Sequence, residues 1–282
     1  MTDLSYGLAV LSSVSYGAAD FLGGLATKRG STLFSVVVLS QLAGLILVLI
    51  ALPFLPASAP TARDFLWGAA GGMAGGAGVG LLYRALAIGV MSVVAPVTAV
   101  CGVIVPVIVG VALGDRPTSL AILGVILAIA AIVLISQSGS VEAGRRATTG
   151  LLTAIGSGIF IGTFLVCLER TGPNAGLWPL VPARVVSVFC FMIAGLFARR
   201  GLMPRREAMP VVIGGGLLDM LANILYLLAV RQGPLSIVAT LASLYPASTV
   251  VLARVVLGER LGVVQQAGVA CAAAAIVLIV SG

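Results

Sequence analysis

Hydrophobic residues fall into long runs along this chain, and short clusters of polar, charged, glycine and proline residues separate the runs. A helix that crosses the hydrocarbon core of a bilayer needs about 20 mostly apolar residues. Ten segments reach that length, so the pattern predicts an all-α integral membrane protein with ten transmembrane helices. The expected spans are residues 4–27, 31–52, 64–87, 90–113, 117–137, 149–169, 176–198, 208–230, 235–257 and 260–281.

The second half of the sequence repeats the first at an offset of 144 residues. The triplet Gly114-Asp115-Arg116 lies in register with Gly258-Glu259-Arg260, and residues 130–135 are identical to residues 274–279. Apolar helices resemble one another by chance, so the triplet of glycine, acid and arginine is the stronger evidence. The repeat predicts two five-helix units, at residues 1–140 and 147–282.

The number of helices in each unit determines how the two units are oriented relative to each other. Five is odd, so the second unit must enter the membrane from the opposite side. Homologous halves of opposite orientation, related by a pseudo-twofold axis in the membrane plane, are typical of carriers that work by alternating access. We therefore expect two inverted five-helix repeats.

The composition supports a membrane protein and argues against several other classes. Hydrophobic residues make up 60% of the chain and charged residues 9%, whereas a soluble domain carries about 25% charged residues. There is no histidine, and the four cysteines lie in apolar runs without metal-binding spacing, so we expect no metal or other cofactor. The net charge of +7 comes from short basic clusters between the apolar runs, which is typical of topogenic loops and not of a nucleic-acid partner.

These basic residues also predict an orientation. They gather in the loops after spans 1, 3, 5, 7 and 9, including Lys28, Arg146 and Arg200. Cytoplasmic loops of membrane proteins are enriched in lysine and arginine. The charge distribution therefore places the loops after odd-numbered spans in the cytoplasm and both termini outside.

The motifs at the end of each half resemble a known family. Leu113-Gly114-Asp115-Arg116 and Leu257-Gly258-Glu259-Arg260 each precede a last helix rich in glycine and alanine. A pattern of alanine, glycine, serine, valine and alanine at residues 85–95 recurs at residues 229–239. In these features the chain resembles the EamA-type members of the drug/metabolite transporter superfamily. The resemblance implies export or exchange of small metabolites without ATP and without covalent chemistry, and it implies cytoplasmic termini, in conflict with the charge distribution.

Two acidic residues inside predicted spans are the first candidates for a binding site. Asp20 lies in span 1 and Asp219 near the middle of span 8. Ionisable groups within a membrane span usually face a cavity or a partner. Either carboxylate could bind a substrate ammonium group or couple transport to protons, or it could belong to a buried ion pair. A neutral replacement of Asp219 is expected to change stability little.

Further polar residues share the faces or the neighbourhood of these acids. Asn223 follows Asp219 by one helical turn and Tyr16 precedes Asp20 by one turn. Arg184 could hold a substrate carboxylate, reach towards the interface, or pair with Asp219. Tyr245 adjoins Pro246, and prolines in spans 4 and 9 can break these helices next to a binding site. The candidate substrate-binding residues are Tyr16, Asp20, Arg184, Asp219, Asn223 and Tyr245.

These features favour a secondary active transporter and not an enzyme. We expect it to move a small polar metabolite, an amino acid or an amine-like compound, by alternating access and in the direction of export. Besides the substrate, its partners would be membrane lipid and a coupling proton or counter-substrate, with the protein a monomer or homodimer in the plasma (cytoplasmic) membrane. The alternatives are an intramembrane lipid-modifying enzyme, a channel, and a flippase for lipid-linked sugars.

Overall fold

The computed structural model describes residues 2–28, 30–54, 59–88, 91–135, 145–257 and 262–281, and every regular element in these ranges is helical. The second Gly-acid-Arg triplet, residues 258–260, lies outside them. The α-helices are α1 (Thr2–Lys28), α2 (Leu33–Ala51), α3 (Ala62–Ile88), α4 (Met91–Ala112), α5 (Ser119–Ile135), α6 (Arg145–Glu169), α7 (Leu180–Phe197), α8 (Met209–Val230), α9 (Leu235–Ala242), α10 (Tyr245–Leu257) and α11 (Val263–Ser281). Three short 3₁₀ helices are η1 (Leu52–Phe54), η2 (Pro173–Ala175) and η3 (Arg206–Ala208).

The helices have the length and surface of membrane spans. Among the described residues, six helical segments are long and apolar enough to cross a bilayer, and four shorter apolar helices accompany them. Large hydrophobic side chains such as Phe189 and Leu196 on α7 lie on the outside of the bundle. The predicted all-α membrane fold is therefore confirmed, while six of the ten predicted spans meet the criterion for a full crossing.

The predicted ninth span is broken, and its counterpart in the first half is not. Residues 243–244 form a turn between α9 and α10, and Pro246 occupies the first turn of α10. A proline is tolerated there because its missing N–H would have no helical partner. Helix α4 continues through Pro96 and Pro106. A break, which the prolines made possible in both halves, is thus present in the second half only, where Pro246 stands 144 residues after Gly102.

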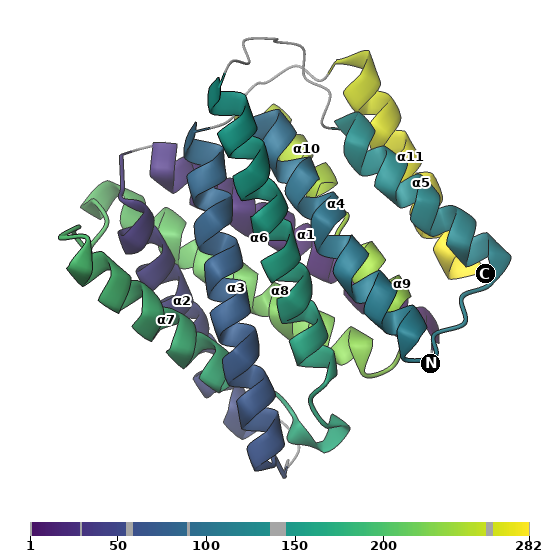
Figure 1. Ribbon diagram of the computed structural model, residues 1–282, viewed down its shortest axis with the longest axis horizontal. Coiled ribbons are helices and arrows are strands. Elements are labelled where there is room, and N and C mark those ends of the chain that lie inside the picture. Colours follow the sequence, from purple (N-terminus) through teal and green to yellow (C-terminus); the bar gives the residue numbers. More distant parts are fainter. Residues whose placement is uncertain are drawn as a thin grey trace.

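The helices of the two halves pack in a symmetric pattern (Figure 1). Helix α1 packs against α8, and α6, its counterpart in the repeat, packs against α3, the counterpart of α8. The counterparts α2 and α7 contact each other, as do α5 and α11, which run in opposite directions at one edge of the bundle. Exchanging the two halves therefore reproduces these four contacts.

Small residues allow the last helices of the two halves to approach closely. Four of them, spaced four apart on α5 and α11, are buried. They are Gly124, Ala128, Gly268 and Ala272. Such spacing is common where membrane helices pack. The structure places this face between the two halves.

Two glycines bring the central helices into backbone contact. The Cα of Gly72 on α3 lies against the backbone of Ala183 on α7, and Gly216 on α8 lies in the same way against Ser40 on α2. These glycines are 144 residues apart and occupy equivalent places in the two halves. Ala183 precedes Arg184, so the close contact also sets the position of that arginine beside α3.

Two aspartates tie helix ends together at the end of the bundle where α3 begins. Asp64 accepts hydrogen bonds from the backbone N–H groups of Thr61 and Gly172, at 2.8 and 2.6 Å. Asp115 accepts a bond of 2.8 Å from the N–H of Ser236, in the first turn of α9. Because Asp115 belongs to the first half and Ser236 to the second, the acid of the Gly-acid-Arg turn joins the halves.

Replacing Gly72 with alanine tests the backbone contact between α3 and α7. The added Cβ would collide with the carbonyl of Ala183, and overpacking of this kind costs about 1–3 kcal/mol. We expect a lower thermal unfolding midpoint in detergent. Gly7→Ala is the matched control, because a Cβ at this exposed position on α1 meets nothing within 4 Å. Equal unfolding midpoints for the two variants would contradict the packing described here.

Candidate functional site

A cavity lies in the middle of the bundle, between the helices of the two halves. It encloses about 850 Å³ that protein atoms do not fill, including space open to solvent, and about 80 Å³ of it can hold the centre of a water molecule. Such a volume has room for several waters or a small solute. All six residues singled out from the sequence line this cavity: Tyr16, Asp20, Arg184, Asp219, Asn223 and Tyr245.

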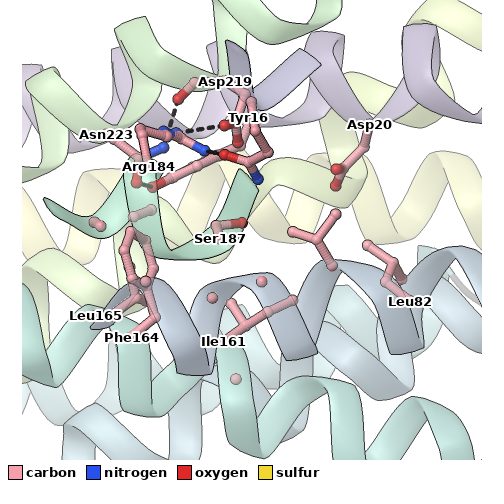
Figure 2. A pocket seen from close by; sticks show the side chains of 18 of the residues that line it. Tyr16, Asp20, Leu82, Ile161, Phe164, Leu165, Arg184, Ser187, Asp219 and Asn223 are labelled. Carbon is pink, nitrogen blue, oxygen red and sulfur yellow. Dashed lines mark hydrogen bonds and ion pairs between the residues drawn. The ribbon is translucent and has the colours of Figure 1, made fainter. Parts of the chain in front are cut away.

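Arg184 on α7 is the centre of the polar side of the cavity (Figure 2). Its Nη2 donates to Oδ2 of Asp219 on α8 at 2.6 Å, and its Nη1 donates to Oε1 of Gln41 on α2. The side chain of Arg184 is 8% exposed and that of Asp219 is 28% exposed. The guanidinium therefore has an acidic partner and a neutral acceptor from two neighbouring helices, and it holds α2, α7 and α8 together.

A second set of hydrogen bonds links α8 to α1. The amide nitrogen of Asn223 donates to the backbone carbonyl of Asp219 at 2.6 Å, and the hydroxyl of Tyr16 donates to Oδ1 of Asn223 at 2.9 Å. Asn223 is buried. The helical spacing that suggested Tyr16 and Asn223 thus corresponds to a direct contact between two helices that are distant in sequence.

Asp20 on α1 faces the same cavity away from the Arg184 cluster (Figure 2). Among the residues that the structure describes, no hydrogen bond or ion pair to its carboxylate is found. The side chain is partly buried. A carboxylate in this setting relies on cavity water or on a bound cation for solvation.

Two buried hydroxyl groups in the cavity lining also lack a hydrogen-bond partner within the described part of the chain. They belong to Ser187 on α7 and Tyr245 at the start of α10, and both residues line the cavity and are buried. Tyr245 lies beside the break between α9 and α10, as the sequence suggested. Sequence reasoning missed Ser187, although its position three residues after Arg184 places it on the same helix face.

The opposite side of the cavity is apolar (Figure 2). It is formed by Ile161, Phe164 and Leu165 on α6 together with the glycines of α3. The phenyl ring of Phe164 lies over Gly75, where an added Cβ would come within 3.1 Å of ring carbons. The glycine run of α3 therefore serves close packing and also gives the cavity part of its width.

The structure settles which partner Arg184 has. Of the three alternatives that the sequence left open, the ion pair with Asp219 is the one formed. The sequence alone predicts that a neutral residue at position 219 changes stability little. With the ion pair present, such a replacement would leave Arg184 without its acidic partner, so we now expect it to lower stability. That these six residues bind a substrate stays a prediction.

Comparisons with known proteins agree with the fold. The profile of the EamA-like transporter family matches residues 4–137 and, a second time, residues 148–281. A crystal structure of another protein is similar to this chain with a TM-score of 0.77 at 13% sequence identity, over 95% of this chain and 97% of the other. This likeness concerns the fold alone. No match is found among curated proteins.

The ion pair can be tested with single and double replacements. Asp219→Asn and Arg184→Gln should each lower the free energy of unfolding, by about 1–3 kcal/mol, because the first leaves the buried Arg184 and the second the partly buried Asp219 without its partner. The double variant removes both charges, so it should unfold close to the wild-type midpoint. Thermal unfolding in detergent measures all three variants. If the two effects simply add in the double variant, the residues are not coupled.

Proposed function

Because the chain belongs to the EamA-like transporter family, and so is a multi-pass membrane transporter of the drug/metabolite type, we propose that it is a secondary active carrier. It moves a small polar metabolite, an amino acid or an amine-like compound, by alternating access and in the direction of export. The observation that carries this proposal is the central cavity, which lies between the two halves and gathers the polar residues of the membrane spans.

The symmetric packing of the halves supports alternating access. A carrier of this type exposes one central site to each side of the membrane in turn, as one repeat moves against the other. The contacts of α2 with α7 and of α5 with α11 join counterparts of the two halves. Helices α5 and α11 run in opposite directions (Figure 1), which favours an axis in the membrane plane. The division into units at residues 1–140 and 147–282 belongs to the same proposal.

The break between α9 and α10 supports a substrate site at this place. Interrupted membrane helices leave backbone groups that solutes and ions can use. Ser243, in the turn, and Tyr245, directly after it, both line the cavity. Movement of this short segment would change the cavity without unfolding a long helix.

We further propose that the protein lies in the plasma (cytoplasmic) membrane, as a monomer or homodimer surrounded by lipid. The distribution of basic residues places the loops after odd-numbered helical spans in the cytoplasm. Asp20 is the group we propose for coupling, either to a proton or to a positively charged counter-substrate, because its carboxylate faces the cavity without a described protein partner.

Transport by purified protein in proteoliposomes tests this function. Uptake of radiolabelled amino acids and amines should exceed that of empty liposomes. Val79 lines the cavity, so Val79→Phe should fill part of it and lower uptake at least tenfold. Val185→Phe is the matched control, because Val185 on α7 is exposed on the outside of the bundle and should tolerate the ring.

Two results would contradict the carrier. One is uptake by Val79→Phe at the wild-type rate, which would separate transport from the cavity. The other is an absence of solute uptake together with movement of lipid-linked sugars between leaflets, which would favour the flippase.

A further inference from the structure

The repeat makes it possible to compare the two walls of the cavity position by position. Asp20 on α1 corresponds to Phe164 on α6, 144 residues later, and both line the cavity. In the same way Asp219 and Asn223 on α8 correspond to Gly75 and Val79 on α3. Positions that are equivalent in the fold therefore carry polar groups on one wall and apolar groups on the other.

This asymmetry shapes the space available to a ligand (Figure 2). Helices α1 and α8 present the carboxylates, and α3 and α6 present the glycines and the ring of Phe164. A solute that fits both walls has a polar end and an apolar body. A small solute that is polar on all sides would leave the apolar wall unused.

The charges on the polar wall decide which polar end is accepted. Arg184 is the basic residue among the described lining residues, and Asp219 and Gln41 already bind its guanidinium. Asp20 and Asp219 are the acidic lining residues, and Asp20 has no described partner. The cavity thus has one carboxylate left for a ligand and no uncommitted guanidinium.

A carboxylate on the ligand would be unfavourable in this arrangement. It would have to displace Asp219 from Arg184, or else lie near Asp20 and Asp219 with neutral donors alone, such as the hydroxyls of Ser187 and Tyr245 or the amide of Gln41. Like charges at short distance in a poorly hydrated site repel each other strongly. An ammonium group has no such difficulty beside Asp20.

We propose that the cavity selects an organic amine with an apolar body and discriminates against the corresponding amino acid. The ammonium group lies against Asp20, and the apolar body lies along the apolar wall that Phe164 and the glycines of α3 form together. The aromatic ring contributes apolar contact and, for a nearby cation, a cation–π attraction. This inference rests on the proposed carrier function and narrows its substrate class.

Three compounds that differ by one group each test the inference. 2-Phenylethylamine has the amine and the ring, phenylalanine adds a carboxylate, and 3-phenylpropionate has the carboxylate without the amine. Their dissociation constants for the purified full-length protein in detergent can be measured by calorimetry. We expect 2-phenylethylamine to bind at least tenfold more tightly than phenylalanine and 3-phenylpropionate to bind most weakly.

Two variants and one control test how much each wall contributes to the affinity for 2-phenylethylamine. Asp20→Asn should weaken binding of 2-phenylethylamine at least tenfold, and Phe164→Ala should weaken it several-fold. Glu207→Gln should leave it unchanged, since Glu207 is an exposed acid in η3, just before α8, and does not line the cavity. The comparison of the three compounds on the wild-type protein does not depend on the folding of any variant.

The inference is overturned if phenylalanine binds as tightly as the amine, if Asp20→Asn leaves amine binding unchanged, or if none of the three compounds binds. These outcomes are distinct from failure of the proposed function. If phenylalanine is transported as well as 2-phenylethylamine and Val79→Phe blocks the transport of both, the carrier stands and the amine selectivity is wrong. If no solute is transported at all, the carrier itself is wrong.

Discussion

The packing of the helices around the cavity depends on the ion pair between Arg184 and Asp219. An arginine inside a membrane span costs about 2.5–3.5 kcal/mol even when it can reach water, so a buried one needs partners. Asp219 and Gln41 supply them from α8 and α2. The three helices must therefore lie close together, and the backbone contacts of Gly216 with Ser40 and of Gly72 with Ala183 make that approach sterically possible.

The pair also underlies the ligand selectivity that we propose. With the guanidinium satisfied inside the protein, the charge that remains available is the carboxylate of Asp20. The equivalent position of the other half carries the phenyl ring of Phe164 in place of this carboxylate. A nearly symmetric scaffold therefore holds an asymmetric site, since sequence divergence between the halves has separated its polar and apolar groups.

Much of this arrangement could be predicted from the sequence, because a membrane leaves few choices to a polar residue. Asp20, Asp219 and Asn223 interrupt apolar runs, so they had to face the interior of the bundle, and the repeat placed that interior between two halves. The partner of Arg184 could not be predicted, since it depends on how α7 and α8 are rotated towards each other. The sequence also did not indicate which span would break, because prolines occur in spans 4 and 9 alike. Helix α4 stays continuous, while α9 ends before Tyr245.

In the carrier that we propose, one cavity is exposed to both sides of the membrane in turn. Ser187 faces the cavity, so Ser187→Cys, in a chain whose native cysteines are replaced by serine or alanine, reports on its exposure. The rate of labelling by a membrane-impermeant thiol reagent can be measured in right-side-out and in inside-out vesicles. Alternating access predicts that the cysteine is labelled from both sides. Labelling from neither side, or from one side under every condition that supports transport, would contradict it.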